Sequence, residues 1–313
     1  MHLDIAIVLA GLIGGFVIGL TGVGGGALLT PLLILLNVNP LVAVSTDIVA
    51  SLVLKPVGAV VHHRQGTINW KLVQWLSLGS VPAALAGVYT ITHLSGKPDT
   101  TIKHILGTVL VIAAAAMIVK SIVAARRRQA SLAPRMLTVR VAPTIAIGVV
   151  GGFIVGLTSV GSGSLMVVLL MLLYPRISGR ELVGTDLVQA IPLVGSAAIG
   201  VAFWGTLHLS VAGSLLVGAI PAVYFGARLS SRANDGYLRP VIILALVFSA
   251  AKMLELDNSI VVTLCAVGLV LVIAEIMRVR RDELAQRARS SMLTDRMTSP
   301  TLTSSATSMP STT

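Results

Sequence analysis

Long apolar runs separated by short polar or Gly- and Pro-containing segments make up most of the chain. Dividing the sequence at those segments predicts a series of helices. The predicted helices cover residues 4–22, 27–37, 40–63, 71–93, 101–123, 141–158, 163–174, 179–204, 209–229, 238–256 and 258–279. All but the second and the seventh are long enough to cross a bilayer, which takes about 20 residues. The pattern therefore predicts an all-α polytopic membrane protein.

The composition supports a membrane location and excludes a soluble globular enzyme. Apolar residues make up 55% and charged residues 11% of the 313 positions, whereas a soluble domain has about 25% charged residues. The net charge is +11, and 11 of the 23 Lys and Arg residues lie within 126–140 and 278–296. Because these basic runs flank segments of membrane length, cytoplasmic loops explain them better than a nucleic-acid partner does.

An internal repeat is the strongest feature of the sequence. Residues Gly11–Gly26 match Gly148–Gly163 at a constant offset of 137. After an insertion of two residues the register continues at an offset of 139, and its matched pairs are Thr46-Asp47 with Thr185-Asp186, Gly66-Thr67 with Gly205-Thr206, and Gly79, Pro82, Ala83 and Gly87 with Gly218, Pro221, Ala222 and Gly226. Compositional bias alone would not keep Asp, Pro and Gly in step. We therefore predict two repeats of five helical elements, each with one short, broken helix.

The placement of Lys and Arg predicts how the repeats are oriented. If the basic loop of residues 126–140 is cytoplasmic, alternation of the helices places the loops carrying Arg64 and Arg180 inside as well, and the Trp204–His208 turn outside. Going from a point in the first repeat to the equivalent point in the second, the chain passes through five membrane elements. Because five is an odd number, equivalent loops of the two repeats lie on opposite sides of the membrane. The repeats should therefore be inverted, which is an architecture of secondary transporters that bind substrate near the midplane.

The sequence divides into five parts on this basis. Residues 1–123 form the first transmembrane repeat, 124–140 a basic cytoplasmic loop, 141–256 the second transmembrane repeat, 257–280 an extra transmembrane helix and 281–313 a Ser/Thr-rich tail. The tail is too polar to bury a core, so we expect it to be disordered. We place it in the cytoplasm.

Two glycine-rich breaks, one in each repeat, are the first candidates for a binding site. Each precedes a helix too short to span the bilayer, so the break should lie at membrane depth. Backbone N–H groups at the start of such a helix attract an anion without a fixed positive side chain. The candidate substrate-binding residues are Thr21, Gly22, Gly24, Gly25 and Gly26, and Thr158, Ser159, Gly161, Ser162, Gly163 and Ser164. The alternative is that glycines only let helices pack closely, which is the better interpretation for Gly11, Gly15 and Gly19 and for Gly148, Gly152 and Gly156.

Polar residues within the predicted membrane helices are the second set of candidates, assigned to coupling or gating. Asp47 and Asp186 occupy equivalent positions, about 12 Å inside their helices. Three interpretations are open for these aspartates. They carry protons, they accept hydrogen bonds that hold the glycine turns in place, or they are ordinary side chains whose hydrogen bonds are made with the backbone of a neighbouring helix. Val194 stands at the position of the second repeat that matches Lys55. Lys55 either attracts an anion into the transport path, extends its ammonium toward the membrane surface (snorkelling), or pairs with Asp47. Gln189 is a functional or a packing residue.

The two aspartates should differ in protonation. A nearby Lys55 favours the ionised form of Asp47, whereas Asp186 has no lysine at the matching position. We therefore predict that Asp186 is the more easily protonated acid and that Asp47 is a structural brace.

No catalytic or metal-binding motif accompanies these residues. The sequence has no His-Glu-x-x-His, no cysteine pair, no G-x-S-x-G elbow and no Walker A loop. We therefore expect neither an enzyme nor an ATP-driven pump, and neither a cofactor nor a metal.

Three sets of motifs, taken together, are typical of a known family. They are the duplicated G-x-x-GG-F-x-x-GLT-x-VG-x-G, the strings Val44-Ser-Thr-Asp47 and Val183-Gly-Thr-Asp186, and His63-Arg-Gln-Gly-Thr-Ile-Asn-Trp70 followed by Gly79-Ser-Val-Pro82. Over residues 4–256 the chain resembles the sulfite exporter TauE/SafE family. The resemblance implies a bacterial or archaeal inner-membrane permease for a small anion such as sulfite, a sulfonate or a related organic acid. Its partners are then that anion and the lipid bilayer, and a homo-oligomer is left open. An anion channel and a scaffold that assembles a partner enzyme are the alternatives.

Overall fold

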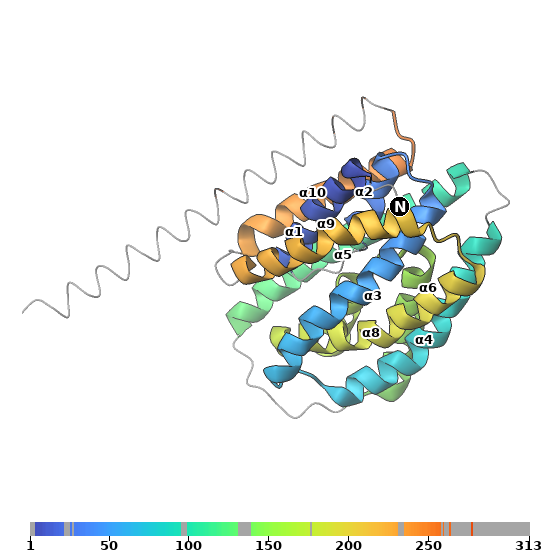
Figure 1. The fold of residues 1–313 in the computed structure, drawn as a ribbon. Coiled ribbons are helices and arrows are strands. Elements are labelled where there is room, and N and C mark those ends of the chain that lie inside the picture. The colour runs from blue at the N-terminus through green and yellow to red at the C-terminus, as the bar shows by residue number, and fades with distance from the viewer. Residues whose placement is uncertain are drawn as a thin grey trace, which may run out of the picture.

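The computed structural model describes residues 4–21, 26, 28–94, 99–130, 139–175, 177–230 and 235–257, together with residues 259, 263 and 277. Within these residues the chain folds into ten helices (Figure 1). They are α1 (Ile5–Thr21), α2 (Leu29–Leu35), α3 (Pro40–Arg64), α4 (Trp70–His93), α5 (Asp99–Ala130), α6 (Val141–Thr158), α7 (Leu165–Leu173), α8 (Gly179–Trp204), α9 (Leu209–Ser230) and α10 (Asp235–Met253). Five of them are long and apolar enough to cross a membrane, so the prediction of an all-α polytopic protein is confirmed.

The helix boundaries follow the sequence breaks closely, with one correction. α5 continues to Ala130, well beyond its predicted end at residue 123. Residues 124–130, predicted to belong to the basic loop, are therefore helical, because Ala, Arg and Gln are strong helix formers. α2 and α7 have only 7 and 9 residues. The predicted helix 258–279, apart from three isolated positions, and the tail lie outside the described residues.

Side-chain caps fix where α3 and α8 begin. Asn39 Oδ1 accepts a hydrogen bond from the backbone N–H two residues further on (3.0 Å), and Ser178 Oγ accepts one from the N–H three residues further on (3.1 Å). Such caps satisfy N–H groups that have no partner inside the helix. Because Asn39 and Ser178 are equivalent positions of the repeat, Asp47 and Asp186 lie at equivalent depths in their helices.

Helices of opposite halves pack together along glycine faces. α1 lies against α9, and α6 lies against α4 (Figure 1). At several glycines of these faces an added Cβ would collide with a backbone carbonyl of the partner helix, which supports their close-packing interpretation. Among these pairs are Gly11 with Leu215, Gly15 with Ala219, Gly148 with Leu76, Gly152 with Ser80 and Gly156 with Ala84. Residue numbers rise together along both helices of each pair, so α1 runs parallel to α9 and α6 runs parallel to α4.

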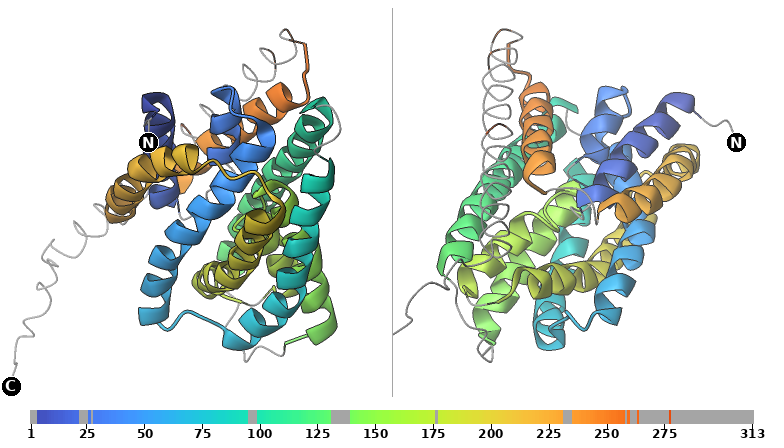
Figure 2. Two further views of the ribbon diagram at one scale, coloured as in Figure 1. Left: turned by 45° about the vertical axis from the view of Figure 1, so that its right-hand side comes forward. Right: turned by 90° about the vertical axis from the view of Figure 1, so that its left-hand side faces the viewer.

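The equivalent helices α3 and α8 lie at the centre of this arrangement. They contact each other, while α3 also contacts α9 and α8 also contacts α4. α5 packs against α10 on one side of the bundle (Figure 2). Large apolar side chains such as Leu12, Leu78, Ile199 and Phe225 are exposed on the outer surface, where they suit contact with lipid. The buried polar side chains of α3 and α8 are thereby kept away from the lipid-facing surface.

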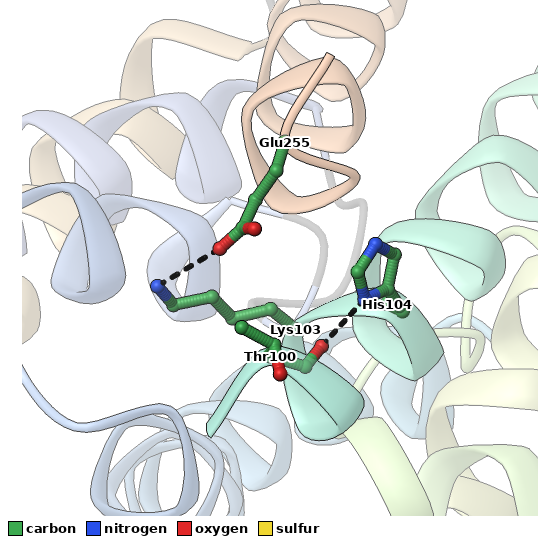
Figure 3. Close-up of polar contacts among 4 residues, drawn as sticks. All are labelled: Thr100, Lys103, His104 and Glu255. Carbon is green, nitrogen blue, oxygen red and sulfur yellow. Dashed lines mark hydrogen bonds and ion pairs between the residues drawn. The ribbon is translucent and has the colours of Figure 1, made fainter. Parts of the chain in front are cut away.

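Polar and aromatic contacts mark the two ends of the bundle. At one end, Lys103 of α5 forms an ion pair with Glu255, which follows α10 (Nζ to Oε1, 3.5 Å; Figure 3). Tyr89 of α4 and Trp204 of α8 meet edge to face at the same end, with ring centroids 5.5 Å apart. We call this the Trp204 end. The opposite end, where α4, α6 and α8 begin, is called the Asn69 end after the N-cap residue of α4.

Candidate functional site

The second glycine break forms a tight turn between α6 and α7. Gly161 and Gly163 have φ angles of 123° and 89°, which glycine adopts without a Cβ penalty. Ser159, which caps the end of α6, is also left-handed, with a φ angle of 59°. The Gly161 carbonyl accepts hydrogen bonds from the N–H groups of Leu165 and Met166 (3.1 and 3.2 Å). The N–H groups of Leu165 and Met166, at the start of α7, thus donate within the turn. The side chains of the turn become the more important donors.

The first glycine break touches the second. Its residues 22–25 lie outside the described residues, whereas Thr21 ends α1 and Gly26 is buried. A Cβ added at Gly26 would overlap the backbone carbonyl of Ser159. The two breaks, which belong to different repeats, therefore meet, as a binding site shared by the two halves requires.

Asp47 joins three parts of the structure. Its side chain is fully buried on α3, and its Oδ2 accepts a hydrogen bond from Thr30 Oγ1 (2.7 Å). The Ser159 side chain lies beside the same carboxylate. Asp47 thus links α3 both to α2 and to the second glycine turn, which is the geometry of a brace. The repeat equivalent of Thr30 is Val167, which has no hydroxyl to donate.

Lys55 lies among the polar groups of the site. Only 6% of its side chain is exposed, and Nζ donates a hydrogen bond to Ser162 Oγ (2.6 Å). The snorkelling alternative is therefore wrong. The ammonium also interacts electrostatically with both Asp186 and Asp47. We call these four residues, Lys55, Ser162, Asp47 and Asp186, the Lys55 cluster.

The cluster changes the comparison between the two aspartates. Asp186 is nearly as buried as Asp47, at 3% exposed, and it too interacts electrostatically with Lys55. Although no lysine stands at the matching position of the second repeat, Asp186 does have a cationic neighbour, because Lys55 of the first repeat lies within electrostatic range of both carboxylates. Linear spacing along one helix gave no sign of this contact across the halves.

Gln189 belongs to a separate contact between the halves. Its Nε2 donates to Ser80 Oγ (2.7 Å), and both side chains are fully buried between α8 and α4. The equivalent positions, Ala50 and Ala219, are also fully buried but apolar. Gln189 therefore joins α8 to α4, while its buried Oε1 has no hydrogen-bond partner among the described residues, so both interpretations of Gln189 stay open.

Ser164 is a buried hydroxyl with unused hydrogen-bonding capacity. It precedes α7 and is 1% exposed, yet its Oγ has no hydrogen-bond partner among the residues that the structure describes. Buried hydroxyls are normally paired. Ser164 therefore offers a donor to a ligand in the turn that also carries Ser162.

One polar contact was missing from the sequence predictions. The Asn69 backbone N–H donates to Thr185 Oγ1 and its Nδ2 donates to Glu181 Oε1, both at 3.0 Å. These bonds tie the start of α4 to the first turns of α8. Within the described part of the chain, no group of three or more His, Cys, Asp or Glu side chains is placed to hold a metal.

Comparison with known proteins identifies the family. The sulfite exporter TauE/SafE family matches residues 7–253. The chain belongs to this family. Probable membrane transporter protein YjnA of Bacillus subtilis (strain 168) is 41% identical over 256 residues, which cover 80% of this chain and 100% of that protein. Probable membrane transporter protein YdhB of the same organism is 24% identical over 231 residues, covering 74% and 91%.

These relatives establish the class of protein. No solved structure matches the chain. The family and its named members are membrane transporters, so the TauE/SafE chain described here is a multi-pass membrane transporter and not an enzyme.

Proposed function

We propose that this transporter is a secondary permease for a small anion such as sulfite, a sulfonate or a related organic acid. The observation that carries the proposal is the buried Lys55 ammonium, which donates to Ser162 of the second glycine turn. Gly161 and Gly163 give that turn its shape, and Ser164 adds an unused hydroxyl. A cation beside two hydroxyl donors suits an oxyanion. Gly26, the described end of the first glycine break, reaches the same turn from the other repeat.

The proposed permease is built from two inverted repeats. α1 runs parallel to α9 and α4 runs parallel to α6, while the short Gly205–His208 connection turns the chain back between α8 and α9. Since α4 and α8 also run together from the Asn69 contact onward, this pattern supports opposite directions for α1 and α6. Inversion places the site where the halves meet, as in other secondary transporters.

The basic Asn69 end is proposed to face the cytoplasm of a bacterial or archaeal cell, in the inner membrane. Arg64, Lys71, Arg140 and Arg228 lie there among the described residues, and so does the acidic Glu181. This excess agrees with the rule that cytoplasmic loops are rich in Lys and Arg. If the predicted extra helix of residues 257–280 crosses the membrane once more after α10, the same orientation places the Ser/Thr-rich tail in the cytoplasm.

Transport by purified protein in liposomes tests the function. Lys55→Met should reduce uptake of sulfite and methanesulfonate by about 10- to 150-fold, since a hydrogen bond to a charged group contributes about 1.5–3 kcal/mol. Lys71→Met is the matched control, because Lys71 is an exposed lysine on α4. Ser162→Ala provides a second, smaller change at the same contact. Each variant is first checked for monodispersity in detergent.

The outcomes separate the alternatives. Saturable uptake that depends on Lys55 but not on Lys71 supports a permease. Flux that never saturates and shows no counterflow would indicate an anion channel. A correctly folded protein that moves no small anion would indicate a scaffold, and the proposal would then be abandoned.

A further inference from the structure

The Lys55 cluster contains more acidic than basic side chains. Among the residues that the structure describes, Lys55 is the one buried cation, whereas Asp47 and Asp186 are both buried. Val194 occupies the equivalent position in the second repeat, so the symmetry supplies no second lysine. With all three groups ionised the cluster has a formal charge of −1, and one bound proton makes it neutral. Neither state has a surplus positive charge.

An entering anion must share the single ammonium with these carboxylates. Lys55 already donates to Ser162 and interacts with both aspartates. Charges in a protein interior interact several times more strongly than in water, so each additional negative charge on a ligand is costly. A monoanion adds one negative charge near the ammonium, whereas a dianion adds two.

We infer that the substrate is a monoanion, such as a sulfonate, hydrogen sulfite or a monocarboxylate, and that dianions are rejected. The inference rests on the proposed permease function and narrows its substrate class. Ser162 and Ser164 fit this class, because neutral hydroxyl donors bind an oxyanion without adding charge. The site would then select its substrate mainly by the charge of the anion rather than by its shape.

Methanesulfonate and sulfate test the inference, because both are tetrahedral and of similar size but carry one and two negative charges. Uptake of each is measured in liposomes with wild-type protein, Asp186→Asn, Asp47→Asn and Lys55→Met. Wild-type protein should prefer methanesulfonate by on the order of tenfold or more. Removing one carboxylate should raise the relative uptake of sulfate several-fold, and Lys55→Met should lose both activities.

Asp47→Asn also weakens the contact with Thr30, so Asp186→Asn is the primary variant and Asp47→Asn the second. Equal uptake of sulfate and methanesulfonate by wild-type protein would overturn the inference and leave the permease function intact. An unchanged preference in both Asn variants, each still active, would also overturn it. Failure of wild-type protein to move either anion or sulfite would instead refute the permease function itself.

The two ends of the bundle provide a second, independent observation. At the Asn69 end, the backbone N–H of Asn69 donates to Thr185 Oγ1. In the repeat alignment Asn69 corresponds to His208 and Thr185 corresponds to Thr46. Thr46 is fully buried, and its Oγ1 has no hydrogen-bond partner within the described residues. The same contact is therefore made at one end and not at the other.

We propose that the Asn69–Thr185–Glu181 contact is a latch that closes the Asn69 end in this structure. Inverted repeats that exchange conformations give alternating access to one site. The opposite state would release Asn69 from Thr185 and bring the His208 backbone N–H to Thr46 Oγ1. Val42 stands at the position equivalent to Glu181, so the second latch has one bond fewer. This proposal rests on the inverted-repeat arrangement and not on the identity of the anion.

Cross-linking tests the latch. The single cysteine, Cys265, is replaced by Ser, and Asn69→Cys is combined with Thr185→Cys. A short, reducible bifunctional thiol reagent should then lower the rate of uptake by about tenfold or more, and reduction of the cross-link should restore it. The same treatment of each single-cysteine variant is the control. Cross-linked protein that still transports at the uncross-linked rate, or a pair that does not cross-link in folded protein, would overturn the proposal.

Discussion

Gly26 and Ser159 bring the two glycine breaks into contact in the part of the chain that the structure describes. An added Cβ at Gly26 would overlap the Ser159 carbonyl, which is backbone and has little freedom to move. The restriction arises from the partner repeat and not from the local conformation. A substitution at Gly26 therefore reports on whether the halves meet as described.

We predict that Gly26→Ala destabilises the protein by about 1–3 kcal/mol, the usual cost of forcing an extra carbon into a packed interior. Gly195→Ala is the matched control, because the nearest atom to its added Cβ is 3.9 Å away. Within helix α8, alanine is favoured over glycine by about 1 kcal/mol. Thermal unfolding in detergent should therefore show a lower midpoint for Gly26→Ala and an equal or higher one for Gly195→Ala. A tolerated Gly26→Ala would contradict the contact between the turns.

The sequence identified most of the candidate site residues but not their contacts. Asp47, Asp186 and Lys55 were recognisable because ionisable residues in apolar helices are costly. Their mutual position was not predictable, since Lys55 meets Ser162 across more than a hundred residues of chain. Thr30 also went unnoticed, because a single hydroxyl on a short helix has no distinctive pattern. Its replacement by Val167 in the repeat was the available signal.

Helix pairs joined by glycine are the structural unit at the next scale. Gly15 of α1 and Gly152 of α6 occupy equivalent positions, and each faces a backbone carbonyl of a helix from the other half. Close backbone approach increases van der Waals packing between membrane helices, where the hydrophobic effect contributes little. The two halves are therefore held together by the same contact made twice.

We predict that Gly15→Val and Gly152→Val each separate their helix pair and lower the yield of monodisperse protein several-fold. Ala86→Val is the control, because Ala86 lies on the exposed face of α4. Size-exclusion profiles of the fluorescently tagged variants measure the effect. If both glycine variants elute as the wild-type protein does, these faces do not hold the halves together.

Helix boundaries were predictable where the sequence contains a cap or a break. The caps at Asn39 and Ser178 lie directly before α3 and α8. The end of α5 was not predictable from apolarity, because its last turns contain Arg and Gln, which continue a helix although they leave the membrane. Apolar pattern therefore located the membrane spans better than it located the helix ends.

At the scale of the whole molecule, charge is distributed unequally between the two ends. The described side chains at the Trp204 end include Lys103 and Lys252 together with the acidic Asp4, Glu255 and Asp257. The Asn69 end is predominantly basic, as described above. A protein inserted with its basic loops in the cytoplasm would therefore expose the Trp204 end outside. The fold gathers these charged residues at each end from loops that are far apart in the sequence.

This orientation predicts opposite accessibility for two equivalent turns. Gln65, in the turn after α3, and His208, in the turn after α8, are both exposed. With Cys265 replaced by Ser, we predict that His208→Cys reacts with a membrane-impermeant maleimide in intact cells, whereas Gln65→Cys reacts only after permeabilisation. A quantitative difference of about tenfold between the two is expected, because the bilayer and not local burial limits the reagent. Permeabilised cells provide the control, since both positions should then react at similar rates. Labelling of both turns from the same side would remove the inverted-repeat arrangement and, with it, the reason for expecting the two latches to alternate.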